Sequence, residues 1–513
     1  MTDNKKFILV KGDVSGIQDF IFNVKSDGAA KSLKAKSFFI KALSKISVVY
    51  LFDKLGIPPE KREECTISVS GGNFFILVPY HENGEQILKK YVAQSNLELS
   101  KIGLSIVISS TQFDSSSYSE KLEELNRKAH TTKYKLFDGV PYSDLFEPIT
   151  ENSNMGWKAF GTKLREANSF SIEINEGNRF GLNGAAITFL SYKLLLKKEL
   201  AQNAEFSLEN KLDTYFPVNF YNNDPKEFKD IAEFAGKSKK LGILKIDVDN
   251  LRSVFQKCNR VENHKQLSEK FRAFFENELY KIISGNNKYK DSIYSIISGG
   301  DDCFLVGGWN KIVDLAFEIN TKFRDYWSKN VSIINKNVTL SAGIVIVHQK
   351  FPVVRFALLV ENALHQAKIT LHSDGFESNT ILPNDDESSV RNVMYSTKDG
   401  LSLLGTVIKW EDWDAIKNIK IKLGNFVIGG HKSLLHNARK AVINNDDIEK
   451  VELSDFWELA YHLREVNKAG KVDELNKILE LYETHIHEAI DRKDNRFRYF
   501  FPIAARLVEL STK

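Results

Sequence analysis

The sequence predicts an α+β protein that contains two related modules and ends in a helical region. The first observation is a repeat: a strand-end aspartate followed by a hairpin with a Gly-Gly turn occurs twice, over 13–72 and over 247–300. The second is the order of the flanking patterns, which give strand, helices, hairpin, helix and strand in both units. The third is the helical periodicity of the chain after about residue 400.

The run 292–307, SIYSIISGGDDCFLVG, is the clearest element, because two β-type segments flank one turn. Gly299 and Gly300 accept positive φ at no steric cost, so the pattern predicts a hairpin. Asp301 and Asp302 then lie at its tip. Adjacent carboxylates repel each other, which favours a cation between them, although Gly and Asp are also ordinary turn formers.

A second stretch, LGILKIDVDNL over 241–251, favours the cation. Its apolar strand ends at Asp247, and Mg²⁺ is typically bound by one or two carboxylates together with substrate phosphates. Two such ions could bind the attacking and the leaving oxygen of a phosphoryl transfer. Lys368, near a predicted helix end, fits either a contact with a triphosphate or a surface lysine. The other elements predicted here are a helix over 311–327, a strand over 338–347 and a helix over 354–371.

The first module begins with a strand over 7–10, after which Ser15 is the expected N-cap of a helix. The lysines before the next, long helix fit either a solvated helix start or a contact with RNA or phosphate; they are Lys31, Lys34 and Lys36. Asn73 follows the Gly-Gly pair where the second module has acids, so we expect this module to be degenerate. Symmetry suggests a pocket where the two modules face each other.

These elements divide the chain into four predicted parts. They are the first module over 1–115, a mixed and mainly helical insert over 116–238, the second module over 239–398 and a helical C-terminal domain over 399–513. Within the insert, the run 183–203 is interpreted as a long helix. No chemistry is assigned to the insert.

Composition narrows the class of protein. With 513 residues, 42% hydrophobic and 27% charged, the chain is globular, and a net charge of +4 restricts any nucleic-acid contact to a local groove. The isolated cysteines Cys65, Cys258 and Cys303 exclude a thiolate zinc site and a disulfide framework. The polar N-terminus and the absence of long apolar runs predict a cytoplasmic protein that makes no membrane contact.

Taken together, the ordered motifs resemble the large polymerase/cyclase subunit of type III CRISPR effector complexes, in the form that lacks an HD nuclease domain. The resemblance covers nearly the whole chain. Its motifs are GDVSGIQDFI from Gly12, KSLKAKS from Lys31, DVDNL from Asp247, SGGDD from Ser298 and LHQAK from Leu364. It implies two ferredoxin-like palm domains related to nucleotide cyclases, an insert and a helical C-terminal domain.

The resemblance also implies roles for individual residues. The catalytic acids would be Asp247, Asp301 and Asp302. Two Mg²⁺ or Mn²⁺ ions would be bound by these acids and by Val248. The ATP substrate would contact Ser298, Gly299, Gly300, Asn250 and Lys368, and a second ATP would contact Ser15 and Gly16.

Two departures from the family pattern carry expectations of their own. The sequence contains no His-Asp dipeptide and enters the first palm almost at once, so we expect no DNase activity. The insert lacks the cysteine pairs that bind zinc in some relatives, so we expect no zinc. A DNA degradation assay and elemental analysis test these two expectations.

The resemblance implies an antiviral, RNA-guided complex in which this subunit converts ATP to a cyclic oligoadenylate messenger when target RNA binds. The expected partners are the other effector subunits, guide RNA and target RNA. The alternatives are a stand-alone nucleotide cyclase or dinucleotide synthase and a catalytically silent scaffold. The sequence does not determine the ring size of the product, whether it is cyclic, linear or joined to a metabolite, or the subtype and stoichiometry of the complex.

Overall fold

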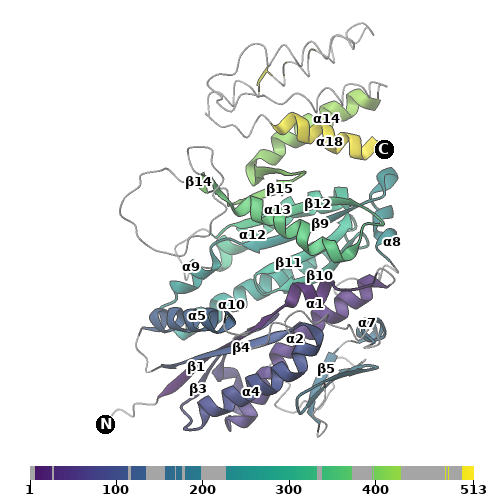
Figure 1. Cartoon of the computed structure of the whole chain (residues 1–513). Helices are drawn as coiled ribbons and strands as arrows, with labels where there is room; N and C mark the ends of the chain where they lie inside the picture. Colours follow the sequence, from purple (N-terminus) through teal and green to yellow (C-terminus); the bar gives the residue numbers. More distant parts are fainter. Residues whose placement is uncertain are drawn as a thin grey trace.

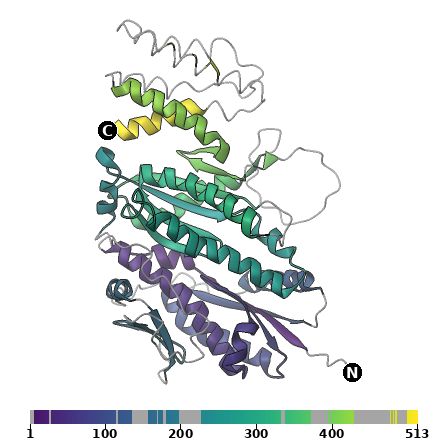
Figure 2. The ribbon, with the colours of Figure 1, turned by 180° about the vertical axis from the view of Figure 1, so that it is seen from behind.

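The fold is described from a computed structural model of the chain. Two α+β modules are stacked on each other, with a small sheet beside the first and helices beyond the second (Figures 1 and 2). The structure describes residues 6–25, 28–113, 117–134, 156–167, 169–175, 180–197, 227–331, 338–371, 395–396, 398–428 and 499–512, and also 476, 480, 483 and 484.

The first module has a four-stranded antiparallel sheet in the order β2-β3-β1-β4. This is the ferredoxin-like order, with two crossover helices in the connections. The strands are β1 (Phe7–Ser15), β2 (Thr66–Ser70), β3 (Asn73–Pro79) and β4 (Ser105–Phe113). The helices are α1 (Ile17–Phe22), α2 (Ala29–Lys54), α3 (Arg62–Cys65) and α4 (Gly84–Leu99), followed by α5 (Tyr118–Tyr134).

The second module repeats this topology, with the order β10-β11-β9-β12 in the first four strands of its sheet. The predicted duplication and the α+β class are therefore confirmed. The strands are β9 (Lys240–Val248), β10 (Ile293–Gly299), β11 (Asp302–Gly308) and β12 (Leu340–His348). The helices are α8 (Phe228–Glu233), α9 (Leu251–Gln256), α10 (Val261–Arg272), the π-helical segment η6 (Ala273–Glu278), α11 (Leu279–Ser284), α12 (Trp309–Asn330) and α13 (Phe356–Lys368).

Two further strands extend this second sheet beyond β12, where we expected helical structure from residue 399. β15 (Gly400–Leu403) pairs parallel to β12, and β16 (Thr406–Lys409) closes the edge. The helices α14 (Trp413–Ile428) and α18 (Phe500–Thr512) follow and pack against each other. The predicted helices between them lie outside the described residues, apart from four isolated positions.

The insert contains a second departure from prediction. The run 183–203 is not a helix: a four-stranded sheet covers its described part, and positive φ angles at Gly184 and Leu190 interrupt any helical path. The sheet consists of β5 (Ser169–Ile174), β6 (Gly181–Asn183), β7 (Ala186–Phe189) and β8 (Tyr192–Lys197), with α7 (Trp157–Glu166) alongside. A two-stranded sheet, β13 (Thr370–Leu371) and β14 (Tyr395–Ser396), follows α13.

The N-cap assignment of Ser15 is also wrong. Ser15 remains in β1, opposite Ser105 of β4, and Gly16 caps α1 instead with φ 84°. A side chain at Gly16 would meet the carbonyl oxygen of Gly103 at 2.3 Å, which explains why a glycine ends the strand there.

Helix α2 lies between the two modules and is buried on all sides, as is typical of a helix without a polar face. Lys34 and Lys36 of the basic run are consequently neither a solvated helix start nor a surface contact with RNA, whereas Lys31 is half-buried and its role stays a prediction. Lys36 is buried and donates to the carbonyl oxygen of Asn23, and Lys34 donates across the module interface to that of Ser295 at 3.4 Å. Burial, with the charge of Lys41 adding to it, lowers the pKa of Lys34 to about 7.

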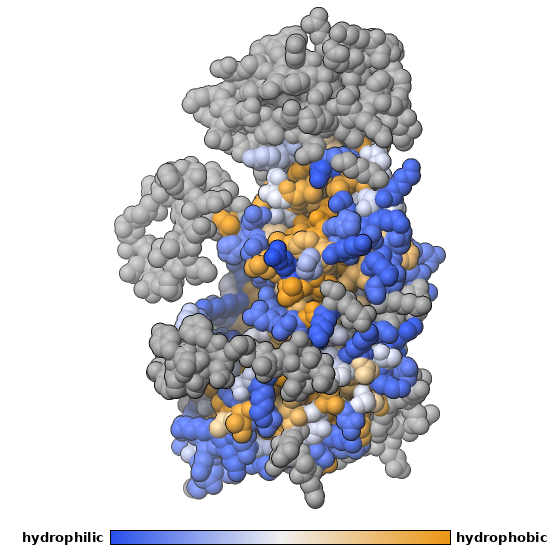
Figure 3. All heavy atoms as spheres, turned by 45° about the vertical axis from the view of Figure 1, so that its right-hand side comes forward, coloured by the Kyte–Doolittle hydropathy of each residue, from blue (hydrophilic) through white to orange (hydrophobic). Residues whose placement is uncertain are grey.

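Apolar residues also gather on one side of the molecule in a band bordered by hydrophilic residues (Figure 3). Within the described part of the chain, no helix combines the length and the apolar character needed to cross a membrane.

Candidate active site

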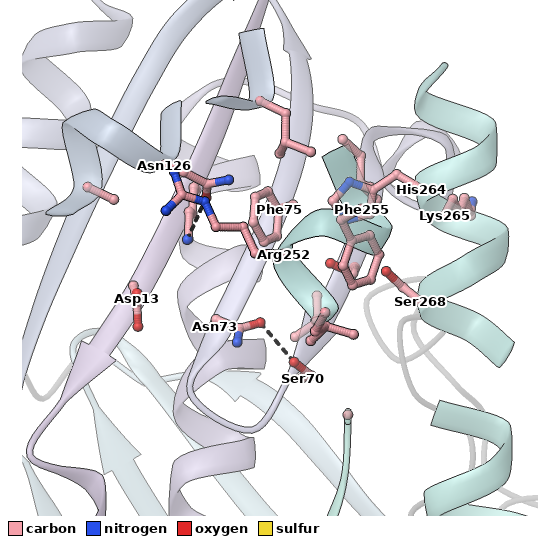
Figure 4. Close-up of a pocket in the computed structure, with 18 of the residues that line it drawn as sticks. Asp13, Ser70, Asn73, Phe75, Asn126, Arg252, Phe255, His264, Lys265 and Ser268 are labelled. Carbon is pink, nitrogen blue, oxygen red and sulfur yellow. Dashed lines mark hydrogen bonds between the residues drawn. The ribbon is translucent and has the colours of Figure 1, made fainter. Parts of the chain in front are cut away.

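A cavity of about 900 Å³ lies between the two modules, where symmetry suggested a shared pocket. Strands β1 to β3 and helix α5 supply one wall, and α9 and α10 supply the other. Figure 4 shows Asp13, Ser70 and Asn73 on the first wall, with His264 and Ser268 on the second. Gly300 and Asp301 of the acidic hairpin line the cavity as well.

Strand register brings the predicted acids together. Asp302 is the first residue of β11 and lies opposite Asp247 of β9 on one side and Gly299 of β10 on the other. Asp301 is in the turn, next to Gly300, whose φ of 70° requires a residue that tolerates the left-handed region. The hairpin therefore brings three carboxylates together at the ends of two neighbouring strands.

Nearby positive charge compensates these carboxylates only in part. Burial, followed by the charge of Asp247, raises the pKa of Asp301, and burial, followed by the charge of Asp301, raises that of Asp302. Burial also raises the pKa of Asp247, although the charge of Lys368 opposes the shift. Acids that resist ionisation beside one another are the expected state of a cation site without its cation.

The chemistry of this donor set fits a divalent cation that prefers oxygen ligands. Within the part of the chain that the structure describes, no three His, Cys, Asp or Glu side chains already converge on one point. One carboxylate oxygen of Asp247 is instead in an ion pair with Lys368. A cation that entered the site would thus compete with this lysine for Asp247.

Lys368 ends α13 and borders a second, smaller cavity of about 270 Å³ beside Asp247. Of the two interpretations left open by the sequence, its ion pair with Asp247 excludes a free surface lysine. Lys245 and Glu361, which form a second ion pair, also line this cavity. Gln18 of α1 donates to Glu361 at 3.3 Å, so the first module reaches this cavity too.

The loop after Asp247 is held by a buried acid that we did not select. Asp249 accepts hydrogen bonds from Thr339 at 2.8 Å, Ser341 at 2.7 Å and the backbone N–H of Asp399 at 3.1 Å. Asn250 next to it has φ 54°, caps α9 and accepts a hydrogen bond from Lys398 at 2.7 Å. Val248 is buried and lies opposite Leu340 of β12. Asp249 therefore positions the strand end that carries Asp247.

Five residues selected as nucleotide contacts do not line either described cavity: Ser15, Gly16, Asn250, Ser298 and Gly299. Ser298 is buried, and its hydroxyl donates to the carbonyl oxygen of Phe275. Ser15 is the last residue of β1, and Gly16 caps α1 two residues before Gln18. Their proposed contacts with nucleotide are not supported by the cavity lining.

The degenerate character of the first module follows from the same register. Asn73 lies opposite Asp13 and pairs with Ser70, so it occupies the place that Asp302 has in the second module. The carboxylate of Asp13 is compensated by Lys133 of α5 at 2.9 Å. This site therefore has one neutralised acid in place of a cluster.

Sequence patterns missed several cavity residues because their helices and strands meet only in the tertiary structure. Lys11 donates to Asn126 across β1 and α5 at 2.8 Å, and Arg252 lies beside them at the start of α9 (Figure 4). One signal was present for Lys245, which precedes Asp247 by two positions and so lies on the same face of β9.

Two family models match separate segments of the chain. Residues 6–151 match domain B of the Csm1 subunit, and residues 240–375 match the second palm domain of Cas10/Cmr2. The second match contains the whole β9–β12 module with its acidic hairpin and Lys368. Both matched segments therefore resemble the Cas10/Csm1 family. The predicted resemblance to the large subunit is confirmed at this level.

Curated Cas10/Csm1 relatives extend the match. The protein of Methanocaldococcus jannaschii, named a CRISPR system single-strand-specific deoxyribonuclease of subtype III-A, is 24% identical over 86% of this chain and 65% of its own length. The protein of the same name from Mycobacterium tuberculosis is 25% identical over 68% of this chain and 51% of its own length. The chain thus spans between half and two thirds of these relatives.

Solved Cas10/Csm1 structures share the fold. The apo Csm1–Csm4 cassette matches with a TM-score of 0.72 at 18% identity, over 100% of this chain and 70% of the other. Csm1 of T. onnurineus matches with a TM-score of 0.70 at 18% identity, over 100% of this chain and 71% of its own. A Csm1–Csm4 cassette in complex with cA3 matches with a TM-score of 0.64 at 17% identity, over 99% of this chain and 70% of the other. The architecture of α+β palm modules and helical parts is confirmed.

Proposed function

We propose that this chain is the nucleotidyltransferase subunit of an RNA-guided type III CRISPR complex and converts ATP to a cyclic oligoadenylate or related adenylate. The observation that carries the proposal is the pairing of Asp247 with Asp302 next to Asp301, which lines a cavity shared by two palm modules. Solved relatives described in complex with ATP and with cA3 support the substrate and product class.

The reaction would join the 3′-hydroxyl oxygen of one ATP to the α-phosphorus of another and break the bond to pyrophosphate, which leaves. The inter-module cavity orients two nucleotides, and Lys368 contributes positive charge beside the acids. Asp247, Asp301 and Asp302, with the carbonyl of Val248, would bind Mg²⁺ or Mn²⁺. Bound there, the metal ions would neutralise charge on the phosphates.

The partners are part of the proposal. Relatives are described as Csm1–Csm4 cassettes, which supports a Csm4-like subunit as a neighbour of this chain. Guide RNA and target RNA would bind the assembled complex and switch the synthase on. Because the net charge of the chain is only +4, these RNA contacts would be confined to a local part of its surface.

The test is mass spectrometry of the products from ATP with Mg²⁺ or Mn²⁺, using the assembled complex with and without matching RNA. RNA-dependent adenylate products support the proposal. If the complex makes no product with either metal, even after candidate co-substrates are added, the scaffold alternative replaces it.

The deoxyribonuclease activity in the relatives' names stands outside this proposal, because the sequence contains no His-Asp dipeptide. We predict that the chain does not degrade single-stranded DNA. Metal-dependent cleavage that persists in an Asp301→Asn/Asp302→Asn variant would contradict this prediction.

Substitution of Lys368 by Met is predicted to shift the pH dependence of synthesis. Lys368 opposes the raised pKa of Asp247, so its loss raises that pKa further, and the carboxylate becomes available for a cation only at higher pH. The acid limb of the rate profile should move to higher pH, with turnover about 10- to 100-fold lower. Lys368→Arg keeps the charge and should leave the limb in place; an unshifted limb in the Met variant contradicts the assignment.

A further inference from the structure

The acidic hairpin is contacted from behind by the first module. The ammonium group of Lys41, on α2, donates to the carbonyl oxygen of Ser298 at 2.6 Å and to a carboxylate oxygen of Glu276 at 3.1 Å. Ser298 directly precedes the Gly-Gly-Asp-Asp turn. Lys41 thus joins a helix of one module to the strand end that carries the acids of the other.

Glu276 reaches this position from the π-helical segment η6, a rare conformation that occurs often at functional sites. The residue before it, Phe275, accepts the hydroxyl hydrogen of Ser298 through its carbonyl oxygen. The π-helical segment therefore contacts the same strand end twice, once directly and once through Lys41.

The contact explains the first glycine of the turn. A Cβ atom at Gly299 would lie 2.8 Å from both the carboxylate oxygen of Glu276 and the ammonium group of Lys41, closer than real Cβ contacts. The next residue, Gly300, faces Ser70 in the first module's hairpin, with 3.5 Å from its ideal Cβ position to the Cβ of Ser70. The turn is thus enclosed by the ion pair on one side and the first module's hairpin on the other.

The ion pair is built to be rigid. The side chains of Lys41 and Glu276 are only 14% and 20% exposed. Burial raises the pKa of Glu276, but Lys41, Lys45 and Arg272 outweigh it, and the net shift is downward. An ionised, buried and hydrogen-bonded pair of this kind has few alternative geometries.

We propose that Lys41 is a positioning residue, through which the first module fixes the acidic turn for nucleotidyl transfer. Its consequence for turnover rests on the proposed function, whereas its effect on the hairpin does not. The first module then has a task besides lining the cavity: it sets the geometry of acids that it does not itself contain.

The test compares Lys41→Met with Lys34→Met in the full chain and in the assembled complex. Lys34 is a matched control, because it also extends from α2 and donates to β10, but at Ser295, three residues before Ser298. Lys41→Met should lower kcat about 10- to 100-fold with KM for ATP changed less than about twofold, since small misplacements of reacting groups have effects of this size. Lys34→Met should leave both unchanged.

Hydrogen–deuterium exchange of the segment 293–308 in the full chain gives a readout that needs no activity. Exchange around Gly299 should accelerate in Lys41→Met and remain unchanged in Lys34→Met. The double variant Lys41→Met/Glu276→Gln also removes the charge that Glu276 keeps when Lys41 is lost. If it shows the same exchange and kcat as Lys41→Met, the effect does not come from leaving Glu276 without its partner. Equal exchange and equal kcat in the two lysine variants would overturn the proposal. If the unsubstituted complex makes no product, only the proposed function fails, and exchange still decides the role of Lys41.

Discussion

Replacement of Asp301 and Asp302 together by Asn is expected to reduce adenylate synthesis by about 1,000-fold or more, because charge stabilisation by bound metal contributes several kcal/mol. The isosteric amides keep the hairpin's shape but lose the negative charge that a cation requires. Product formation from ATP by the assembled complex, followed by mass spectrometry, measures this loss. If the variant retained more than about a tenth of the activity, the metal ions would have to bind at other residues.

The same variant is expected to be more stable than the unsubstituted protein when no metal is added. Folding raises the pKa of both acids above that of an unfolded aspartate, so the folded state binds more protons and its stability falls as the pH rises through this range. Melting temperatures should therefore diverge with increasing pH, with the variant higher. Added Mn²⁺ should raise the melting temperature of the unsubstituted chain alone.

Asp249 supplies the contrasting control. Asp249 is buried, whereas Asp247, Asp301 and Asp302 are half-buried, and three donors already satisfy the carboxylate of Asp249. Asp249→Asn should therefore lower the melting temperature. Only the oxygen of an amide accepts hydrogen bonds, so the NH2 group of the asparagine would face a donor that it cannot satisfy. If both substitutions shift the melting temperature in the same direction, charge repulsion at Asp301 and Asp302 is not the cause.

Substitution of Gly343 by Ala is expected to displace α13 and with it Lys368. A Cβ atom at Gly343 in β12 would lie 2.4 Å from the backbone nitrogen of Leu364 and 2.8 Å from the carbonyl carbon of Ala363. Neither atom can rotate away, so the helix must shift. We expect the free energy of unfolding to fall by about 1–3 kcal/mol, and synthesis to fall about 100-fold as Lys368 moves away from Asp247.

Gly181 in β6 is the matched control, because it is also a strand glycine but has no atom within 4 Å of its ideal Cβ position. Gly181→Ala should change stability by less than about 0.5 kcal/mol. Chemical denaturation of both variants measures the difference. A Gly343→Ala protein of unchanged stability and activity would show that α13 tolerates a wider separation from β12.

Features that depend on neighbours in sequence were predictable. Gly299 and Gly300 between two β-type runs identified the hairpin, and its register then brought Asp302 opposite Asp247. The repeat was readable because both modules place an aspartate at a strand end before a Gly-Gly pair. Local turn chemistry and period-2 patterns determine such elements.

Features that depend on what covers a segment were not predictable. Lys34 and Lys36 have the local pattern of a solvated helix start, yet α2 is enclosed by both modules. The run 183–203 has apolar residues that fit a helix, but Gly184 and Leu190 take positive φ and turn it into strands. Ser298 was selected from its motif, whereas its orientation toward Phe275 follows from tertiary packing.

The packing of α1 and α2 against the second module limits how the chain can be divided. Phe22 packs against Phe304 of β11 with ring centroids 4.6 Å apart, and the hydroxyl of Tyr294 donates to the carbonyl oxygen of Ala30. One apolar cluster contains these residues together with Ile243 and Val306. A fragment that begins at residue 227 would keep all three proposed catalytic acids yet expose this face to water. The smallest unit that folds around the acids therefore includes the module that lacks them.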